Sequence, residues 1–412
     1  MMHTSSSIQV EQRVAERLAE LARISETQEG VTRRYLTPEH KRANELVGGW
    51  MRDAGMNVHE DAAGNIRGRM EGADPSLPAI MLGSHLDTVV RAGAYDGTLG
   101  VIAAIEAVSR LHEQGRRPQH PVEVIGFADE EGARFGVTYL GSAAVAGLWE
   151  KSWFDAVDAD GVTLRQAMLD FGLNPDAVGD ARTAPESLCG YIELHIEQGI
   201  LLEKYDRPLG AVTGINCSRR FHIRILGKTG HAGTIPMSCR QDPMMGAAAI
   251  ITSLERIAHG YGDSLYCTVG YITCTPNTAN CIPGEIDLRL DVRSCRTEEL
   301  EEALRRMLES AEAICRERHL TFICTPFFES RLAECSPALV EQVSRAVTAV
   351  QGDCPMLSSG AGHDAAEMSR VWPMAMIFLR CKNGVSHCPE EYASPVDMEA
   401  GVQALLNVLA CY

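Results

Sequence analysis

The order of three segments constrains the fold of this chain more than any other feature. Residues 79–85 and 122–127 are short apolar runs of the kind that form buried strands, and residues 98–111 between them repeat apolar residues at helical spacing. Strands that alternate with helices in this way form a largely parallel sheet. We therefore predict an α/β domain that binds its ligands at the edge where the parallel strands end.

Residues 214–329 have a different pattern, that of a small α+β domain with amphipathic helices. The predicted strands are 221–226, 265–273 and 285–292, and the predicted helices are 242–257 and 297–318. After this segment the α/β pattern returns, with a strand predicted at 374–379. We therefore predict one large domain of residues 1–213 and 330–412, into which the smaller domain is inserted.

Composition argues against several classes of partner. The formal net charge of −17 disfavours nucleic acid. No apolar run of about 18 residues predicts a membrane span, and residues 1–13 lack the apolar stretch of a secretory signal. The 14 cysteines all lie beyond residue 188, and none of them form a Cys-x-x-Cys pair. This distribution is typical of reduced thiols and not of a disulfide scaffold. We therefore expect a cytoplasmic protein that acts on a small molecule.

A histidine and two aspartates follow the first predicted strand. His85 ends the strand, Asp87 lies two residues further on, and Asp96 follows in the next loop beside a glycine. A single histidine at a strand end is often structural, but carboxylates this close favour a metal site. Asp87 is also placed to hold the imidazole of His85 by its second nitrogen, as carboxylates behind metal ligands do.

Three consecutive carboxylates, Asp129, Glu130 and Glu131, follow the second predicted strand. Such a run repels itself unless a cation lies among its members, although a solvated acidic turn has the same sequence. Its position at the same sheet edge as His85 favours the metal site. Adjacent carboxylates also allow a division of roles, in which one binds the metal and the other takes a proton from water.

Two further groups are weaker when taken alone. A period of two places Glu193, His195 and Glu197 on one face of a strand, and His387 follows the strand predicted at 374–379. Both groups also fit a solvated surface. Together with the first two groups they form a mixed set of imidazoles and carboxylates, which divalent metals bind. One zinc ion held by three side chains is an alternative, although it would leave other carboxylates uncompensated.

The last group lies inside the predicted inserted domain. Glycines at positions 230 and 233 flank His231 and expose its imidazole on a tight loop. Exposed loop histidines mostly have no role. His231 therefore becomes a functional residue only if this loop folds over the metals.

In this order, the motifs resemble the di-metal amidohydrolases of the M20 peptidase family. The resemblance covers nearly the whole chain and is to the hydantoinase/carbamoylase branch, which contains N-carbamoyl-L-amino acid hydrolases, β-ureidopropionase and allantoate amidohydrolase. The matching motifs are Gly-Val-Thr-Arg (30–33), Asp-Ala-Ala-Gly-Asn-Ile-Arg-Gly (61–68), Gly-Ser-His-Leu-Asp-Thr-Val (83–89), Glu-Glu-Gly-Ala-Arg-Phe (130–135), Glu-Leu-His-Ile-Glu-Gln-Gly (193–199), Gly-His-Ala-Gly-Thr (230–234), Pro-Asn-Thr-Ala-Asn (276–280), Gly-Ala-Gly-His-Asp (360–364) and Gly-Val-Ser-His (384–387).

The resemblance implies two divalent metal ions per subunit, with zinc, manganese, cobalt and nickel all compatible with the ligands. In the family pattern Asp96 bridges both ions. His85 and His195 complete one site, and Glu131 and His387 complete the other. The family uses the water between the two ions to hydrolyse a small amide or ureido compound.

The resemblance also implies roles for residues around the metals. Glu130 would be the general base, and Asp87 would orient His85. His231 matches the family's oxyanion stabiliser, which reaches the active site from the small domain of the partner subunit. The family therefore implies a homodimer in which residues 214–329 form the dimerisation domain.

Gln198, Asn280 and Arg293 match the positions at which the family holds the ureido and carboxylate groups of its substrate. Two segments that border the substrate depart from the branch. Residues 217–218 are Cys-Ser where the branch has Gly-Gln, and residues 380–381 are Arg-Cys, followed by Lys382, where it has a Pro-Ser pair. These departures leave the substrate open.

We therefore favour a hydrolase that releases ammonia, carbon dioxide and an amino acid from an N-carbamoyl amino acid or a related ureido compound. The alternatives are an allantoate amidohydrolase, an amidase or aminoacylase of ordinary linear amides, and a non-catalytic binding protein with the same fold. The presence of Glu130 disfavours the last, because a binding protein needs no general base.

Overall fold

The computed structural model describes residues 4–412, with side chains from residue 12 onward, so the first residues of the N-terminal segment considered above lie outside it. The chain divides into two compact units. The first consists of Met1–Thr213, Glu334–Leu357 and Ala361–Tyr412, and the second of Gly214–Ala333 and Ser358–Gly360. Each unit has its own buried apolar core.

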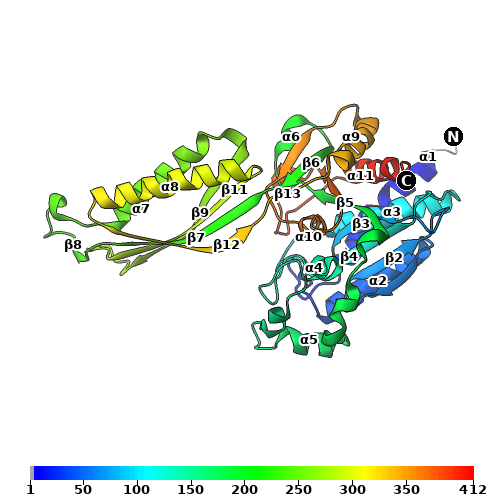
Figure 1. Ribbon diagram of the computed structural model, residues 1–412, viewed down its shortest axis with the longest axis horizontal. Helices are drawn as coiled ribbons and strands as arrows, with labels where there is room; N and C mark the ends of the chain where they lie inside the picture. Colours follow the sequence, from blue (N-terminus) through cyan, green and yellow to red (C-terminus); the bar gives the residue numbers. More distant parts are fainter. Residues whose placement is uncertain (1–3) are drawn as a thin grey trace. The chain divides into compact units, whose positions relative to one another are not determined.

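A mixed sheet of nine strands is the frame of the first unit (Figure 1). Its order is β1-β2-β4-β3-β5-β15-β6-β13, and β14 pairs with β6. At the centre β3, β4, β5 and β15 run parallel, whereas β1, β2 and β6 join as antiparallel neighbours. The strands are β1 (Asn57–Glu60), β2 (Ile66–Met70), β3 (Ala79–His85), β4 (Val122–Phe127), β5 (Leu188–Ile196), β6 (Leu209–Ile215), β13 (Ala333–Glu334), β14 (Met356–Ser359) and β15 (Met374–Leu379). The predicted α/β class is confirmed.

Helices cover both faces of this sheet. The helices that share one core with the sheet are α1 (Thr4–Leu21), α2 (Pro38–Asp53), α3 (Thr98–Glu113), α9 (Pro337–Gln351) and α11 (Pro395–Leu409). In this core Leu82, Val124 and Ile377 of the central strands are fully buried. On the opposite face α10 (Asp364–Met368) contacts β5, β15 and the short helix α4 (Leu140–Ala146). The central strands are therefore covered on both sides, which explains why nearly all of their residues are buried.

The loop between β3 and α3 leads the chain from the sheet edge into the helix. The predicted helix 98–111 is confirmed as α3, which begins directly after Gly97. Gly97 has φ of 64°, in the left-handed region that glycine adopts without strain. A Cβ atom at this position would lie 2.3 Å from Nε2 of His85. Glycine is therefore required both by the turn and by the imidazole beside it.

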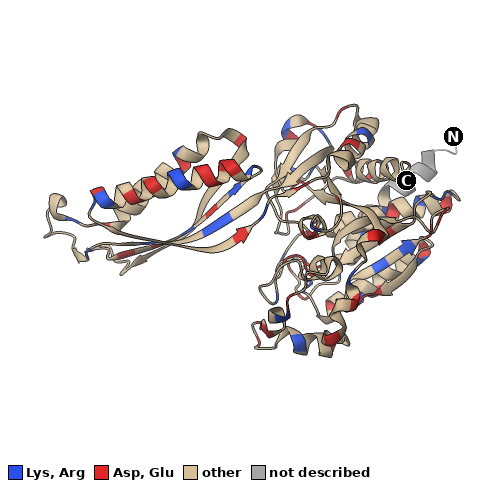
Figure 2. Ribbon diagram, viewed as in Figure 1, with Lys and Arg blue, Asp and Glu red and all other residues tan. Residues whose placement is uncertain are grey.

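The second unit contains a four-stranded antiparallel sheet in the order β12-β7-β11-β9. Its strands are β7 (Cys217–Leu226), β9 (Leu265–Thr275), β11 (Glu285–Ser294) and β12 (Thr321–Ser330). Helices α7 (Pro243–His259) and α8 (Thr297–Glu317) lie along one face of it (Figure 1). The exposed side of α8 carries both signs of charge (Figure 2), as where Arg305 pairs with Glu302 and Glu309 at 2.8 Å.

The three strands predicted in this segment are confirmed, whereas β12 was not predicted. Its apolar alternation is interrupted at Pro326, where the pairing of β12 with β7 shifts register by one residue. Phe327 is the extra residue of this bulge, so Phe327 and Phe328 follow each other without the period of two that marks a strand. Pairing with β7 nevertheless continues on both sides of the bulge.

Two remaining features bear on function. A two-stranded sheet pairs β8 (Gly230–His231) with β10 (Cys281–Ile282) in the second unit. Among the helices of the described chain, none combines the length and the apolar character that crossing a membrane requires.

Gly83 of β3 provides a test of how tightly the central strands pack. A Cβ atom at Gly83 would lie 2.1 Å from the carbonyl oxygen of Ile125 on β4, so Gly83→Ala must push two strands apart. We expect the free energy of unfolding of the first unit to fall by about 1–3 kcal/mol, as overpacking does. All four tryptophans lie in this unit, so fluorescence during denaturant unfolding reports on it alone.

Gly49→Ala is the matched control. Gly49 lies inside α2, and a Cβ atom there would meet no atom within 4 Å. We expect this substitution to be neutral or to stabilise the unit by about 0.5–1 kcal/mol. Equal stability of the two variants would contradict the close approach of β3 and β4.

Candidate metal centre

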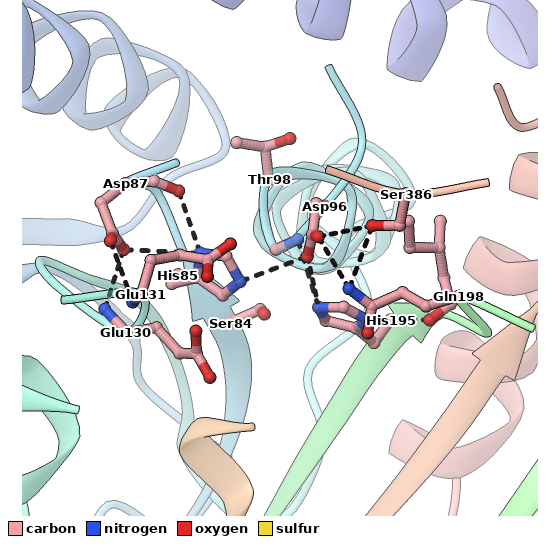
Figure 3. Close-up of polar contacts among 12 residues, drawn as sticks. Ser84, His85, Asp87, Asp96, Thr98, Glu130, Glu131, His195, Gln198 and Ser386 are labelled. Carbon is pink, nitrogen blue, oxygen red and sulfur yellow. Dashed lines mark hydrogen bonds and ion pairs between the residues drawn. The ribbon is translucent and has the colours of Figure 1, made fainter. Parts of the chain in front are cut away.

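Asp96 is buried and lies at the centre of a group of histidines and carboxylates, in which His85 and His195 are also buried and His387 is exposed (Figure 3). One carboxylate oxygen, Oδ1, is 3.1 Å from Nε2 of His195 and 3.5 Å from Nε2 of His85. The other oxygen, Oδ2, is 3.1 Å from Nε2 of His387. The carboxylate of Asp96 therefore faces two separate sets of side chains, one with each oxygen.

These side chains form two groups that share Asp96. The first group is His85, Asp96 and His195, and the second is Asp96, Glu131 and His387. Within each group one ligand atom of every residue lies within 4.8 Å of the others. The structure thus brings together all five residues that the sequence predicts as metal ligands, from the ends of β3, β4, β5 and β15 and the loop before α3.

The second nitrogens of two imidazoles are held by backbone carbonyls. Nδ1 of His85 is 3.0 Å from the carbonyl oxygen of Asp87, and Nδ1 of His195 is 2.8 Å from that of Ile196. A carbonyl oxygen can only accept, so Nδ1 carries a proton in both rings. Nε2, the nitrogen that faces Asp96, is therefore the one available to a metal.

The carboxylate of Asp87 mainly holds the acidic loop after β4. Its two oxygens accept the backbone N–H groups of Glu130 and Glu131 at 2.9 and 3.1 Å. Its Oδ1 also lies 3.4 Å from Nδ1 of His85, further away than its own backbone carbonyl. Asp87 therefore supports the loop that carries Glu130 and Glu131 as well as the imidazole of His85.

Glu130 has the environment of a proton acceptor. It is 8% exposed, and an oxygen of its carboxylate belongs to a group with His85 and Glu131 whose ligand atoms lie within 4.8 Å of one another. Burial raises its pKa well above the usual range. No described residue donates a hydrogen bond to its carboxylate, so both oxygens are available for a proton.

Not every residue of the sequence motifs belongs to this group. Glu193 is buried and accepts hydrogen bonds from Ser84, Tyr191 and the backbone N–H of Ala365. Glu197 lies past the end of β5, and its carboxylate accepts the backbone N–H groups that open the helix α6 (Leu201–Tyr205). Both carboxylates therefore have structural partners of their own.

Comparisons with known proteins agree with this arrangement. Residues 81–410, most of the chain, match the family described as peptidase family M20/M25/M40. The N-carbamoyl-L-amino-acid amidohydrolase of Paenarthrobacter aurescens is 39% identical over 399 residues, with 97% of each chain covered. The allantoate deiminase of Arabidopsis thaliana is 37% identical over 423 residues, which cover 95% of this chain and 81% of that protein. A solved amidase of the hydantoinase/carbamoylase family from Burkholderia multivorans has a TM-score of 0.92 at 31% identity, with 97% of both chains covered.

The chain belongs to peptidase family M20/M25/M40. The predicted resemblance to the hydantoinase/carbamoylase branch is confirmed, and so is the assignment of this M20 protein as a hydrolase.

The residues of this M20 site fit divalent metal ions. Imidazole nitrogens and carboxylate oxygens are the ligands that such ions take in proteins. Burial would raise the pKa of Asp96, but hydrogen bonds with three imidazoles hold it well below its usual range. The hydrogen bond with Asp96 raises the pKa of His387 to about 9, and burial raises that of Glu131 to about 7. The carboxylates thus depend on nearby positive charge, which a divalent cation supplies.

Three side chains hold Asp96 in place. Nε2 of Gln198 and Oγ of Ser386 each donate to Oδ2 of Asp96 at 2.8 Å. Glu391 accepts the backbone N–H groups of Tyr95 and Asp96 at 2.8 and 3.0 Å, and its other oxygen lies 3.1 Å from Oγ of Ser386, whose single proton the two carboxylates share. Glu391 therefore joins the loop of Asp96 to the loop of His387. Glu391 is buried whereas its neighbour Glu390 is exposed. The sequence alone does not distinguish the two, because both residues are glutamates.

The remaining predicted residues lie in the second unit. His231 is exposed on β8, and the backbone carbonyl of Asn280 accepts the N–H of Ala232 beside it at 3.0 Å. Asn280, directly before β10, therefore lies close to the strand that carries His231. Arg293 lies on β11, where its guanidinium donates to Asp291 at 2.7 Å and to the carbonyl oxygen of Gly360 at 2.7 Å.

Glu391→Gln tests whether the support of Asp96 matters for metal binding. The substitution keeps the shape of the side chain but removes the charge that accepts two backbone N–H groups and a hydroxyl. We expect the Kd for Mn²⁺ or Zn²⁺ to rise about 10–100-fold, as for other residues directly behind metal ligands. Titration calorimetry on chelator-stripped protein measures this Kd.

Glu390→Gln is the control, because it changes the adjacent, exposed carboxylate in the same way. We expect its metal affinity to match that of the unmodified protein. The same affinity in both variants would show that Glu391 does not support the metal ligands.

Proposed function

We propose that this chain hydrolyses the C–N bond of an N-carbamoyl amino acid or a close ureido relative, with release of ammonia, carbon dioxide and an amino acid. One observation carries the proposal. The unbonded carboxylate of Glu130 lies beside a complete set of metal ligands, in a chain 39% identical to an N-carbamoyl-L-amino-acid amidohydrolase over 97% of both lengths.

We propose that two divalent ions occupy the site and that zinc, manganese, cobalt and nickel are the candidates. His85, His195 and Asp96 would hold one ion, and Asp96, Glu131 and His387 the other. When bound, such a pair polarises the substrate carbonyl and lowers the pKa of a water molecule between the ions. The two oxygens of Asp96, each facing one set, support its role as the bridge.

Glu130 is the general base of this proposal. Its carboxylate takes a proton from the attacking water and passes it to the leaving nitrogen. Burial favours the protonated form that this second transfer needs, because its pKa is raised. The backbone of Glu130, fixed by Asp87 at 2.9 Å, holds the carboxylate in position during both transfers.

His231 is the proposed stabiliser of the oxyanion. Its Nδ1 accepts the backbone N–H of Gly233 at 3.1 Å, so in the neutral ring the proton resides on Nε2. The exposed imidazole therefore offers a hydrogen-bond donor, which an oxyanion requires. We propose that it acts in the active site of the second subunit of a homodimer, with residues 214–329 as the dimerisation domain.

Three residues are proposed to hold the substrate. Oε1 of Gln198 is buried and accepts no hydrogen bond from the described residues, so it suits a ureido N–H. Asn280 offers an exposed amide beside His231. The planar guanidinium of Arg293 suits the substrate carboxylate, which it can bind with two parallel hydrogen bonds.

Allantoate is the second candidate substrate. The Arabidopsis allantoate deiminase is 37% identical over 95% of this chain. The two segments that differ from the branch, 217–218 and 380–382, are where a difference in substrate would be expected. In segment 380–382, Arg380 is already held by Asp397 at 2.9 Å and by Asp206 at 3.0 Å. In segment 217–218, Oγ of Ser218 donates to Asp291, which in turn holds Arg293. Segment 217–218, which departs from the branch, therefore adjoins the site proposed for the substrate carboxylate.

A substrate panel tests the function. The metal-loaded protein is incubated with N-carbamoyl-L-amino acids, with allantoate and with N-acetyl-L-amino acids, and released ammonia and free amino acid are measured. Ammonia from a carbamoyl amino acid is the expected result. Free amino acid from the acetyl series without ammonia from any ureido compound would instead identify an aminoacylase.

Glu130→Gln should separate chemistry from metal binding. We expect the variant to retain its metal content, measured by elemental analysis, but to lose at least about 10²-fold in kcat because the proton acceptor is gone. Glu131→Gln, one residue further on, should instead lower the metal content. Turnover at the original rate in Glu130→Gln would remove this residue from the role of base.

Mixing two inactive variants tests the action of His231 across the dimer. If each active site combines Glu130 of one subunit with His231 of the other, a His231→Ala protein mixed with a Glu130→Gln protein forms one intact site in each mixed dimer. Random exchange should then restore about a quarter of the original activity. Mixtures as inactive as their parents, with subunit exchange verified by mass spectrometry, would place both residues in the same subunit or remove His231 from the site.

A further inference from the structure

A pocket of about 470 Å³ lies in the second unit, on the face of the sheet that α7 and α8 leave open. Its size is in the range of small-molecule sites. The charged residues that line it are Arg220, Arg289, Arg293 and Asp291, and its aromatic walls include Tyr266 and Phe327. Three guanidinium groups therefore face one carboxylate, which leaves the pocket with a net charge of +2.

Asp291 is shared by two of these arginines. It accepts Nε of Arg220 at 3.0 Å and Nη2 of Arg293 at 2.7 Å, and it also accepts Oγ of Ser218 at 3.1 Å. One carboxylate thus compensates two guanidinium groups only in part. In the proposed function, the substrate carboxylate binds to this remaining positive charge at Arg293.

Arg289 provides a second surplus charge. It forms no ion pair and no hydrogen bond with the residues that the structure describes. Its guanidinium carbon lies 5.1 Å from the ring centre of Tyr271 and 5.5 Å from that of Phe327. Contacts with aromatic rings fix the guanidinium group without occupying its five N–H donors.

The position of this arginine is built into the sheet. Arg289 on β11 is paired directly with Tyr271 on β9, and Phe327, the extra residue of the bulge, lies on β12, beyond β7 on the other flank of β11. A shortage of acidic residues does not explain its lack of a partner, because the chain has 55 Asp and Glu against 38 Lys and Arg. Some exposed arginines of the unit are paired, as Arg305 is with two glutamates on α8, whereas Arg316 and Arg318 form no ion pair with the described residues, so Arg289 differs by its two rings and its place in the pocket.

We propose that this pocket selects N-carbamoyl amino acids whose side chain carries a second carboxylate, and that Arg289 binds this carboxylate. The inference rests on the proposed function, in which Arg293 takes the first carboxylate. A dianionic substrate matches the net charge of the pocket. With a substrate that has one carboxylate, the guanidinium group of Arg289 would hydrogen-bond only to water, although two aromatic rings hold it in place.

The test compares matched substrate pairs in the metal-loaded enzyme. N-carbamoyl-L-glutamate and N-carbamoyl-L-aspartate differ from N-carbamoyl-L-glutamine and N-carbamoyl-L-asparagine only in the side-chain charge. We expect kcat/KM to be at least about tenfold higher for the acidic member of a pair, the size of one charge-assisted hydrogen bond. Arg289→Gln should abolish this ratio and leave kcat/KM for the amide members within about threefold.

Two further variants make the result specific. Arg306→Gln removes an exposed arginine of the same unit that also lies over an aromatic ring, 5.6 Å from that of Tyr261, but outside the pocket. It should leave the ratio unchanged. Arg289→Lys keeps the charge without the planar fork and should keep part of the ratio.

The outcomes distinguish this inference from the proposed function. Hydrolysis of carbamoyl amino acids with equal kcat/KM for the acidic and amide members would overturn the inference and leave the proposed function standing. A preference for the acidic substrates that persists in Arg289→Gln would also overturn the inference and leave the proposed function standing. Another residue would then bind the side-chain carboxylate. No ammonia from any ureido compound would overturn both.

Discussion

The carboxylate of Asp96 is the interaction on which the rest of the site depends. Its two oxygens face imidazoles from different parts of the chain, His85 and His195 on one side and His387 on the other. A buried carboxylate is stable there only because positive charge surrounds it. The parallel centre of the sheet makes this possible, since the ends of β3, β4, β5 and β15 meet at one edge and carry their ligands to the same place.

Other buried carboxylates hold the loops that carry these ligands. Asp87 accepts two backbone N–H groups of the loop after β4, and Glu391 accepts two of the loop before α3. Loops rarely hold a side chain to the accuracy that a metal requires unless a second contact fixes their backbone. Acidic residues here therefore have two uses, as ligands and as supports for ligands, and this accounts for their density around one centre.

The second unit contributes a different chemistry, built on a separate core. Its sheet buries one face against α7 and α8 and leaves the other open, where arginines exceed acids in one pocket. The metal centre suits a carbonyl and a leaving nitrogen, whereas this face suits anionic groups. In the proposed function, reaction type and substrate choice are therefore assigned to different parts of the chain, which allows one to change without the other. The Cys-Ser departure at 217–218 touches the arginine network and none of the metal ligands.

The sequence by itself determined the fold class through strand periodicity and the family through motifs that follow one another in order, and the resemblance to that family predicted five metal ligands. His85, the carboxylates after β4 and His387 could all be predicted in this way. Tertiary structure alone decided which of two adjacent glutamates, Glu390 or Glu391, supports Asp96, since burial separates residues of identical type. It also decided that β12 is a strand in spite of its bulge, and that Arg289 lies beside two aromatic rings and forms no ion pair with the described residues. Burial, strand pairing and ion pairing all depend on residues that are distant in the chain. A local sequence pattern therefore does not show which charged side chains are left without a partner.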